Sequence, residues 1–578
     1  QPPDHLACLF TMRPAHATKA FDISVGTRVE ADGGLTPLVL LVSAVAAIGG
    51  FVFGYDIGGG GGSFAMEGFQ TQFGWANKSE AVRADEIGWI SALLTLGAAA
   101  GAAPSGILSD RVGRRPCIIT SALIFSIGAS LQAFASGSPS ASLAQLYVGR
   151  LVGGFGVGML STTVPVYIAE CAPGSWRGSL SMCWQFAIVI GIVVASLANV
   201  PLAHWDQGWR VSYGGNVVFA LLLALLMVWM PESPRWLGQR GREAALRRTL
   251  SRLRSSTLAA EEEATSIEAK AAEEAAGGAS SWRGLLRRPL AMRHRMLLGV
   301  ALQCWQPLAG INAIMFFAPK ILLAYFSAEA ALWGTLGINV ANAAATVVAL
   351  VGVDRLGRVP LLLASGLLMC VCHLAMVALA LSPPSQQLGY AVVSVASLFV
   401  ASFAFGWGPL PWTVCSEIFP TKYRSKATAV TTATNWLVNT AVGKVFPLLP
   451  LATAFAIFAA ACFAACATVF FFQPETANLG MEQIDEAFES HRVRRVSAKL
   501  WSADRRARIR AEGRRRMRAA AGAAAVAYAS EVRAAGVGGA ARTGKGTEYF
   551  VPVSACGAYA NRGGNSYAAE NPLLRAFG

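Results

Sequence analysis

Charged residues are scarce in this chain of 578 residues, and their scarcity excludes most soluble folds. Only 14% of the residues are Asp, Glu, Lys or Arg, whereas 54% are hydrophobic and the mean hydropathy is +0.46. A water-soluble protein of this length cannot bury so much apolar surface. The composition therefore indicates an integral membrane protein.

Histidine is also rare, and cysteine lacks the spacing of a metal site. The six His residues are scattered, and the eleven Cys residues show no paired-ligand spacing. Most of the cysteines fall in apolar segments, where Cys acts as a small apolar filler. His373 stands in such a segment without an obvious metal or catalytic partner. We therefore expect no metal, no cofactor and no enzymatic activity.

Long apolar stretches are abundant. A bilayer core of about 30 Å needs about 20 apolar residues per helix, and twelve segments meet this requirement. The sequence thus predicts an all-α membrane protein with twelve transmembrane helices. The predicted segments are residues 37–60, 86–109, 116–136, 143–168, 179–201, 211–230, 296–325, 331–353, 359–382, 388–416, 427–449 and 451–472.

Three charged motifs occur twice, at offsets of 244, 247 and 243 residues. Six apolar segments accompany each copy, which predicts two six-helix repeats with the same orientation. Such repeats are typical of transporters in which one half rocks against the other. The first copy contains Asp110–Arg115, Glu170 with Arg177, and Pro231–Ser233; the second contains Asp354–Arg358, Glu417 with Arg424, and Pro474–Thr476.

The basic residues predict the domains and their orientation. Lys and Arg concentrate in the connections that follow even-numbered helices, which places those connections and both termini in the cytosol. The sequon at Asn77 falls on the outer side, in agreement. We expect a multi-pass protein of the plasma membrane. Its predicted domains are a cytosolic segment 1–36, a helix bundle 37–230, a cytosolic loop with short helices 231–295, a second bundle 296–472, and a basic, partly disordered cytosolic tail 473–578.

The net charge of +15 could suggest nucleic-acid binding, since twelve Lys or Arg residues crowd into 492–518. Cytosolic positive charge beside an anionic membrane leaflet explains them better, and we expect no nucleic-acid partner.

The repeated motifs place acidic and basic side chains together at the cytosolic helix ends. Arg and carboxylate groups can pair there and hold helix ends together, which favours an interpretation as an inner gate. Positive charge that only sets the topology would explain the Arg residues but not the matched acids. The predicted gate comprises Asp110, Arg111, Arg114, Arg115, Glu170, Arg177, Glu232, Asp354, Arg355, Arg358, Glu417, Arg424 and Glu475.

With these motifs, residues 37–484 resemble the sugar porter family of the major facilitator superfamily. In motif the chain is most similar to the plant and algal hexose–proton symporters. The matching segments are Gly106–Arg115, Gly149–Gly158, Pro165–Glu170, Pro231–Leu237, Gly310–Pro319, Gly408–Trp412 and Pro474–Thr476.

The resemblance implies a sugar site at the bilayer midplane. Sugars need amide and hydroxyl partners and an aromatic face, although an intramembrane Asn or Gln can equally join two helices. The usual second glutamine of helix 7 is Pro307 here, which removes one amide and predicts a kink. The implied binding residues are Phe53, Gln185, Gln306, Asn312, Asn342, Trp412 and Asn435.

The first helix carries the implied proton site. Asp56 would accept the proton and Arg150 would be its partner, the alternative being a permanent ion pair that does not titrate. The run Gly58–Gly62 predicts that this helix ends or bends early. Residues 63–85 would then form a lid, which cannot be held by a disulfide as in the plant symporters because they contain no Cys.

Together these features predict a monomeric transporter that imports a monosaccharide, with a hexose favoured, and a proton across the lipid bilayer. The alternatives are a facilitative sugar uniporter with the same path, or a non-transporting sugar sensor whose tail recruits other proteins.

Overall fold

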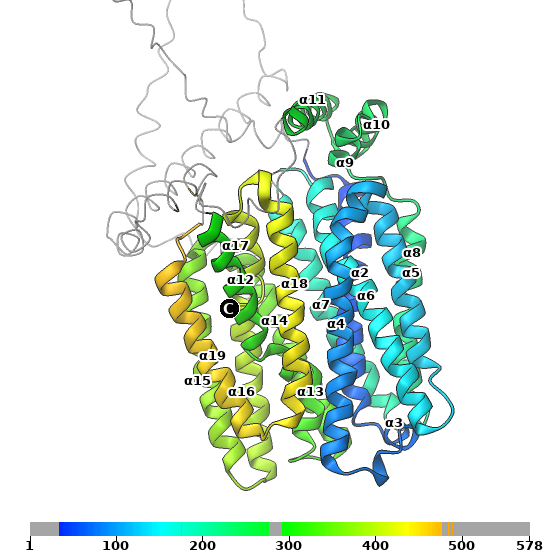
Figure 1. Ribbon diagram of the computed structural model, residues 1–578, viewed down its shortest axis with the longest axis vertical. Helices are drawn as coiled ribbons and strands as arrows, with labels where there is room; N and C mark the ends of the chain where they lie inside the picture. Colours follow the sequence, from blue (N-terminus) through cyan, green and yellow to red (C-terminus); the bar gives the residue numbers. More distant parts are fainter. Residues whose placement is uncertain (1–33, 175, 277–291, 477–483, 485–487, 489–578) are drawn as a thin grey trace, which may run out of the picture. The chain divides into compact units, whose positions relative to one another are not determined.

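The computed structural model describes residues 34–174, 176–276, 292–476, 484 and 488, and all regular elements in these ranges are helical, as predicted. Six long helices form the first half (Figure 1). Their bounds lie within a few residues of the predicted segments, or extend them. They are α2 (Pro37–Ser63), α4 (Glu80–Val112), α5 (Arg114–Ala133), α6 (Pro139–Cys171), α7 (Arg177–Leu202) and α8 (Gly208–Met227).

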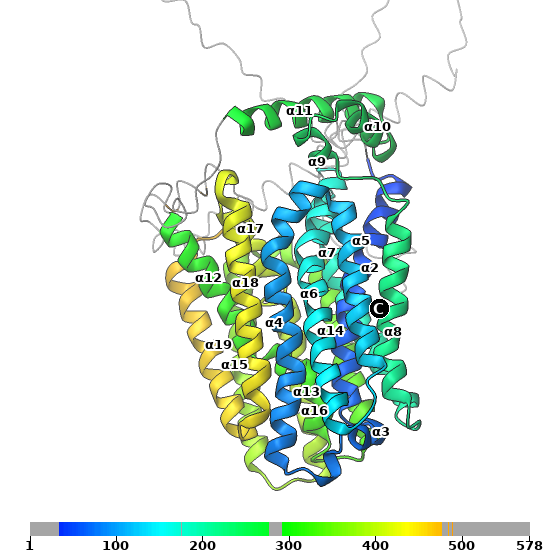
Figure 2. The ribbon, with the colours of Figure 1, turned by 45° about the vertical axis from the view of Figure 1, so that its right-hand side comes forward.

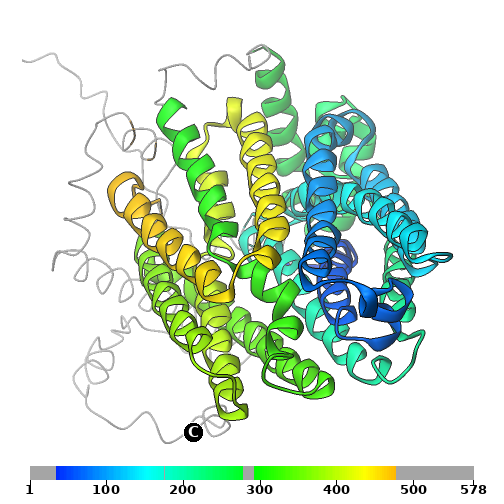
Figure 3. The same cartoon turned by 60° about the horizontal axis from the view of Figure 1, so that its bottom comes forward.

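The second half repeats this arrangement beside the first (Figure 3). Its first and fourth predicted segments, 296–325 and 388–416, are each one apolar span that is broken into two helices. The breaks fall near Pro307 and Pro409, which remove backbone N–H donors. The helices are α12 (Met292–Leu308), α13 (Ile311–Leu322), α14 (Ala328–Leu356), α15 (Arg358–Leu381), α16 (Gln386–Phe405), α17 (Leu410–Ile418), α18 (Thr421–Val445) and α19 (Leu451–Phe472).

Eleven segments within the described ranges are long and apolar enough to cross a membrane. The segments α12–α13 and α16–α17 each count as one of them. Helix α18 is the exception, because Thr, Asn and Lys residues dilute its apolar character. It nevertheless packs between the halves against α4 and α12.

Three shorter helices follow the first half, namely α9 (Pro234–Gln239), α10 (Glu243–Leu253) and α11 (Thr257–Ala276) (Figure 2). They share a small apolar core around Trp236 and Leu250. Arg254 ties this group to the bundle, since its guanidinium donates to the Cys171 carbonyl at 2.9 Å and to Glu263 at 2.6 Å. We call this end of the molecule the loop end.

The opposite end, which we call the lid end, carries α3 (Glu67–Gln72) and the 3₁₀ helix η1 (Trp75–Asn77) (Figure 1). Aromatic rings hold this segment in place: the Phe69 ring lies 4.4 Å from that of Phe73 and 5.5 Å from that of Trp209. This segment contains no Cys, and aromatic packing holds it in place where a disulfide could not.

Helix α2 continues through Gly58–Gly62 and ends at Ser63, so the expectation that it ends early was wrong. The glycines are needed because neighbouring helices approach on several sides. A Cβ at Gly61 would lie 2.7 Å from the Phe316 carbonyl oxygen, and one at Gly60 would overlap the Arg150 guanidinium. Close packing therefore offsets the low helix propensity of glycine, about 1 kcal/mol per residue.

Contacts between the halves gather at the lid end. Lys444 of α18 forms an ion pair with Asp85 of α4 and lies 4.4 Å from the centre of the Trp89 ring. The Phe64 ring, which follows α2, stacks on Phe317 of α13 with centroids 6.5 Å apart. These contacts join the two halves where the lid covers them.

Candidate transport site

A buried ion pair joins α2 to α6. Asp56 has no exposed surface and Arg150 is only 1% exposed. The Nη1 atom of Arg150 donates to Oδ2 of Asp56 at 2.7 Å. Each charge is costly to bury and depends on the other, so neutralising either one leaves the other without its main partner. The structure thus brings together the two residues that the sequence paired.

Helix α8 completes this pair with two residues that the sequence did not predict. The hydroxyl of Tyr213 accepts from Nη2 of Arg150 at 3.0 Å, and the guanidinium carbon lies 5.0 Å from the tyrosine ring centre. Asn216 donates to Oδ1 of Asp56 at 3.3 Å. Their spacing of three residues, which places both on one helix face, is the signal that could have found them.

Five amide side chains form a second polar cluster, which we call the amide cluster. At its centre, Nδ2 of Asn435 donates to the side-chain oxygens of Gln306 and Gln303, both at 2.9 Å. Asn439 donates to Oδ1 of Asn435 at 3.0 Å, and Asn312 donates to Asn439. The cluster therefore links α12, α13 and α18.

Pro307 explains part of this arrangement. A helical N–H at position 307 would donate to the carbonyl of Gln303, four residues earlier, but proline has none. Nδ2 of Asn435 lies 3.2 Å from this carbonyl and donates to it instead. Gln303 and Asn439 were missed from the sequence, although each lies one helical turn from a predicted residue, Gln306 and Asn435 respectively.

The remaining predicted binding residues are distributed over both halves. The Phe53 ring of α2 meets the Trp436 ring of α18 edge to face at 5.5 Å, so it stands between the halves. Asn342 is buried in α14, with its Nδ2 3.9 Å from Sδ of Met315. Gln185 and Trp412 are half-buried on α7 and α17.

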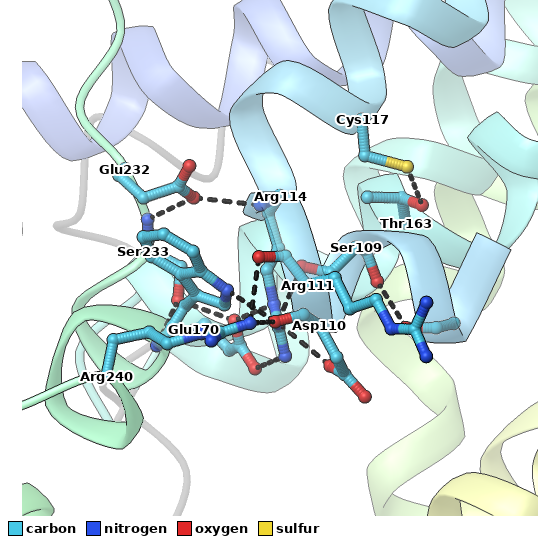
Figure 4. Close-up of polar contacts among 12 residues, drawn as sticks. Ser109, Asp110, Arg111, Arg114, Cys117, Thr163, Glu170, Glu232, Ser233 and Arg240 are labelled. Carbon is cyan, nitrogen blue, oxygen red and sulfur yellow. Dashed lines mark hydrogen bonds and ion pairs between the residues drawn. The ribbon is translucent and has the colours of Figure 1, made fainter.

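A charged cluster lies at the loop end of the first half (Figure 4). Arg114, at the start of α5, binds Glu170 of α6 with two hydrogen bonds, from Nε at 3.0 Å and Nη2 at 3.2 Å. Its Nη1 atom also lies 2.9 Å from Asp110. Ser233 donates to Glu170 at 2.5 Å. Three helix ends are thereby held together.

Glu232 caps the start of α5. Its carboxylate accepts from the backbone N–H groups of Arg114 at 3.0 Å and Arg115 at 3.2 Å, where the helix dipole favours negative charge. Burial raises the pKa of Glu232, while the backbone N–H groups act in the opposite direction. Gly113, with φ of 111°, makes the tight turn that brings α4 and α5 to this carboxylate.

The second half repeats the Arg–Glu pair, the hydroxyl contact and the capping Glu of this cluster. Arg358 donates to Glu417 at 3.2 Å, and Thr476 donates to the other oxygen of Glu417 at 2.5 Å. Glu475 accepts from the backbone N–H groups of Arg358 at 2.9 Å and Val359 at 3.1 Å. The sequence repeat is thus a repeat of hydrogen-bond geometry.

Three other predicted gate residues are placed by the structure as follows. Arg111 and Arg177 are exposed, and Arg177 donates to the Ala169 carbonyl at 2.9 Å. Arg424 donates to the Phe419 carbonyl at 3.2 Å. The side chains of Asp354 and Arg355 lie outside the described part of the structure. Each cluster, as described, is contained within one half and holds that half together.

No three His, Cys, Asp or Glu side chains come together as a metal site would require, as far as the described ranges extend.

The fold, its two repeats and the paired clusters define a membrane transporter of two halves. Residues 42–488 match the sugar (and other) transporter family, and the chain belongs to this family. Its members are transporters and not enzymes.

Similar proteins cover about four fifths of this chain. Sugar transport protein 1 of Arabidopsis thaliana is 32% identical over 79% of this chain and 91% of its own length. The galactose–proton symporter of Escherichia coli K12 is 32% identical over 80% and 97%. Among solved structures, the xylose transporter XylE of E. coli, in a partially occluded inward-open conformation, matches with a TM-score of 0.67 and 28% identity, over 77% of this chain and 100% of that one.

Proposed function

We propose that this transporter imports a monosaccharide, in the first place a hexose, together with a proton by alternating access. The observation that carries the proton coupling is the fully buried pair of Asp56 and Arg150. A proton on Asp56 removes the negative charge and weakens its hold on Arg150. Helix α2 is then free to shift against α6.

Helix α2 is well placed to transmit this event. It carries Asp56 in its interior and meets the second half at Gly61, against the Phe316 carbonyl of α13. Arg150 keeps the hydroxyl and ring of Tyr213 as partners when Asp56 is neutral. One hydrogen bond and one ring contact of the arginine therefore persist in both protonation states.

The amide cluster and nearby aromatic rings support a polyhydroxylated substrate. Gln306, Asn312 and Asn435 offer donors and acceptors that can exchange partners with sugar hydroxyls. Phe53 and Trp436 bring an apolar surface between the halves. The similar proteins whose names state a substrate transport sugars, among them galactose and xylose.

The two charged clusters serve as the supports of the inner gate. They hold the helix ends of each half as rigid units, so that closing the loop end brings two preformed surfaces together. The loop end and both termini face the cytosol, in keeping with the Lys and Arg residues there. The lid end faces the outside, and the protein works as a monomer in the lipid of the plasma membrane.

Labelled glucose uptake into transporter-deficient cells tests the proposal, at mildly acidic and neutral external pH, with and without a protonophore. We expect uphill uptake that rises with external acidity and collapses with the protonophore. Uptake that only equilibrates, at a rate independent of pH, would contradict proton coupling and indicate a facilitative uniporter.

A further inference from the structure

His373 is a buried histidine that neither the proton pair nor the amide cluster uses. It lies in α15 with 1% of its surface exposed. Its Nε2 atom lies 2.8 Å from the carbonyl oxygen of Ala309. A carbonyl oxygen can only accept a hydrogen bond, so Nε2 carries the proton and donates it.

Ala309 stands at the break between α12 and α13. Gly310 has φ of +85°, and its N–H turns back to the Pro307 carbonyl at 3.0 Å. The helical ladder resumes only with the N–H of Ile314, which donates to the Gly310 carbonyl at 3.2 Å. Carbonyls at such a break lose their helical donors and need others, because an unpaired buried carbonyl costs about 1–3 kcal/mol.

The ring of His373 is fixed from three sides. Its centre lies 4.5 Å from that of Phe399, 5.7 Å from that of Phe455 and 5.6 Å from that of Phe458. Phe458 also covers Gly310, where a Cβ would lie 2.6 Å from the phenylalanine ring. The break between α12 and α13 thus packs against residues of α15, α16 and α19.

Beyond the break, α13 reaches the other half of the molecule. The Phe316 carbonyl contacts α2 at Gly61, and Phe317 stacks on Phe64 with ring centres 6.5 Å apart. The same helix carries Asn312 of the amide cluster. Opening of the lid end must therefore separate α13 from α2, while the first residue of α13 stays connected to α12.

We propose that His373 is a positioning residue that fixes the pivot of α13. Its N–H holds the Ala309 carbonyl to α15, so that α13 turns about Gly310 as one piece and carries Asn312 toward and away from the sugar. The sugar-dependent part of this inference rests on the proposed function, whereas the pivot itself rests only on the contacts of His373.

Two substitutions separate the N–H group from the ring. His373→Phe keeps a ring among the three phenylalanines and removes the donor, while His373→Gln restores a donor N–H. We expect His373→Phe to raise the apparent KM for sugar about tenfold, with Vmax per transporter within about twofold. His373→Gln should recover most of the affinity. Ser365→Ala is the matched control, since Ser365 is buried in the same helix and donates within it, to Leu361 at 2.6 Å.

Hydrogen–deuterium exchange of the full-length chain in membranes gives a second readout that does not depend on transport. In His373→Phe, amides of Ile311–Leu322 should exchange about tenfold faster, while those of Met292–Leu308 stay near the wild-type rate. If the phenylalanine variant does not reach the membrane, His373→Leu replaces it as the variant without a donor.

Three results would overturn the proposal: unchanged KM and exchange in the variant without a donor, equal behaviour of His373→Gln and His373→Phe, or the same changes in Ser365→Ala. A wild type that transports no sugar would refute the proposed function alone, and exchange over Ile311–Leu322 would still decide the role of His373.

Discussion

Gly60 of α2 lies against the guanidinium group of Arg150, so closely that a Cβ at this position would overlap Nη2. The same nitrogen donates to Tyr213 at 3.0 Å. The side chain of Arg150 lies against α2 at Gly60, which has no side chain to block its approach to Asp56. Gly60 is thus required by the packing of the buried ion pair, and the glycine run does not end the helix.

This relationship predicts the effect of a methyl group on α2. Gly60→Ala should displace Arg150 and lower proton-driven sugar accumulation at least about tenfold, because the buried pair tolerates little misplacement. Gly59→Ala is the matched control: its Cβ would lie 3.0 Å from the Ser212 hydroxyl and 3.5 Å from the Ser212 carbonyl oxygen, and accumulation should stay within about twofold. Equal losses in the two variants, at equal amounts in the membrane, would contradict the assignment.

Hydropathy and the repeated motifs were sufficient to predict the twelve-helix fold, because length, apolar character and charge determine which segments cross a bilayer. They could not predict that α2 continues through Gly58–Gly62, because helix propensity contains no information on the packing of neighbouring helices. The kink beside Pro307 was predicted, but the Asn435 side chain that donates to the carbonyl left free by this proline was not.

Family resemblance and residue type led to the ion pair of Asp56 and Arg150 and to three members of the amide cluster. Gln303 and Asn439 were not predicted as members of the cluster, because their role arises from contacts between α12 and α18 that no local sequence pattern indicates. His373 escaped for the same reason, since its partner is a backbone carbonyl 64 residues away.

The amide cluster predicts a loss of sugar affinity in Asn435→Ala. This change removes the donor to Gln303 and Gln306 and leaves the carbonyl that Pro307 exposes without a partner. We expect the apparent KM to rise about tenfold, which corresponds to about 1.4 kcal/mol. Thr434→Ala is the neighbouring control, because its hydroxyl donates only within α18, to Val430 at 2.9 Å. An unchanged KM in Asn435→Ala would remove the amide cluster from the sugar path.

The ion pair of Lys444 and Asp85 predicts a shift between conformations. It joins α18 to α4 at the lid end and is partly exposed, with side-chain exposures of 20% and 50%. Its loss in Lys444→Ala should favour opening of the lid end by a factor of about 2–5, as expected for a pair of modest strength. The measurement is labelling of Thr440→Cys by an impermeant thiol reagent, relative to the chain without that cysteine.

Two further variants sharpen this test. Exchanging the charges, with Lys444→Asp and Asp85→Lys together, should return labelling toward its original rate. Lys78→Ala breaks an ion pair with Glu86 that stays within one half, at 2.7 Å, and should leave labelling unchanged. Equal labelling in Lys444→Ala and its parent would show that the pair does not hold the lid end closed.

Asp56→Asn is the variant that decides whether Asp56 carries the transported proton. Accumulation and exchange of labelled sugar would be measured in the same cells, with Glu67→Gln on the exposed face of α3 as the carboxylate control. We expect Asp56→Asn to abolish uphill accumulation while sugar exchange survives, because the amide cluster is intact and the proton acceptor is gone. Undiminished accumulation in Asp56→Asn would contradict it.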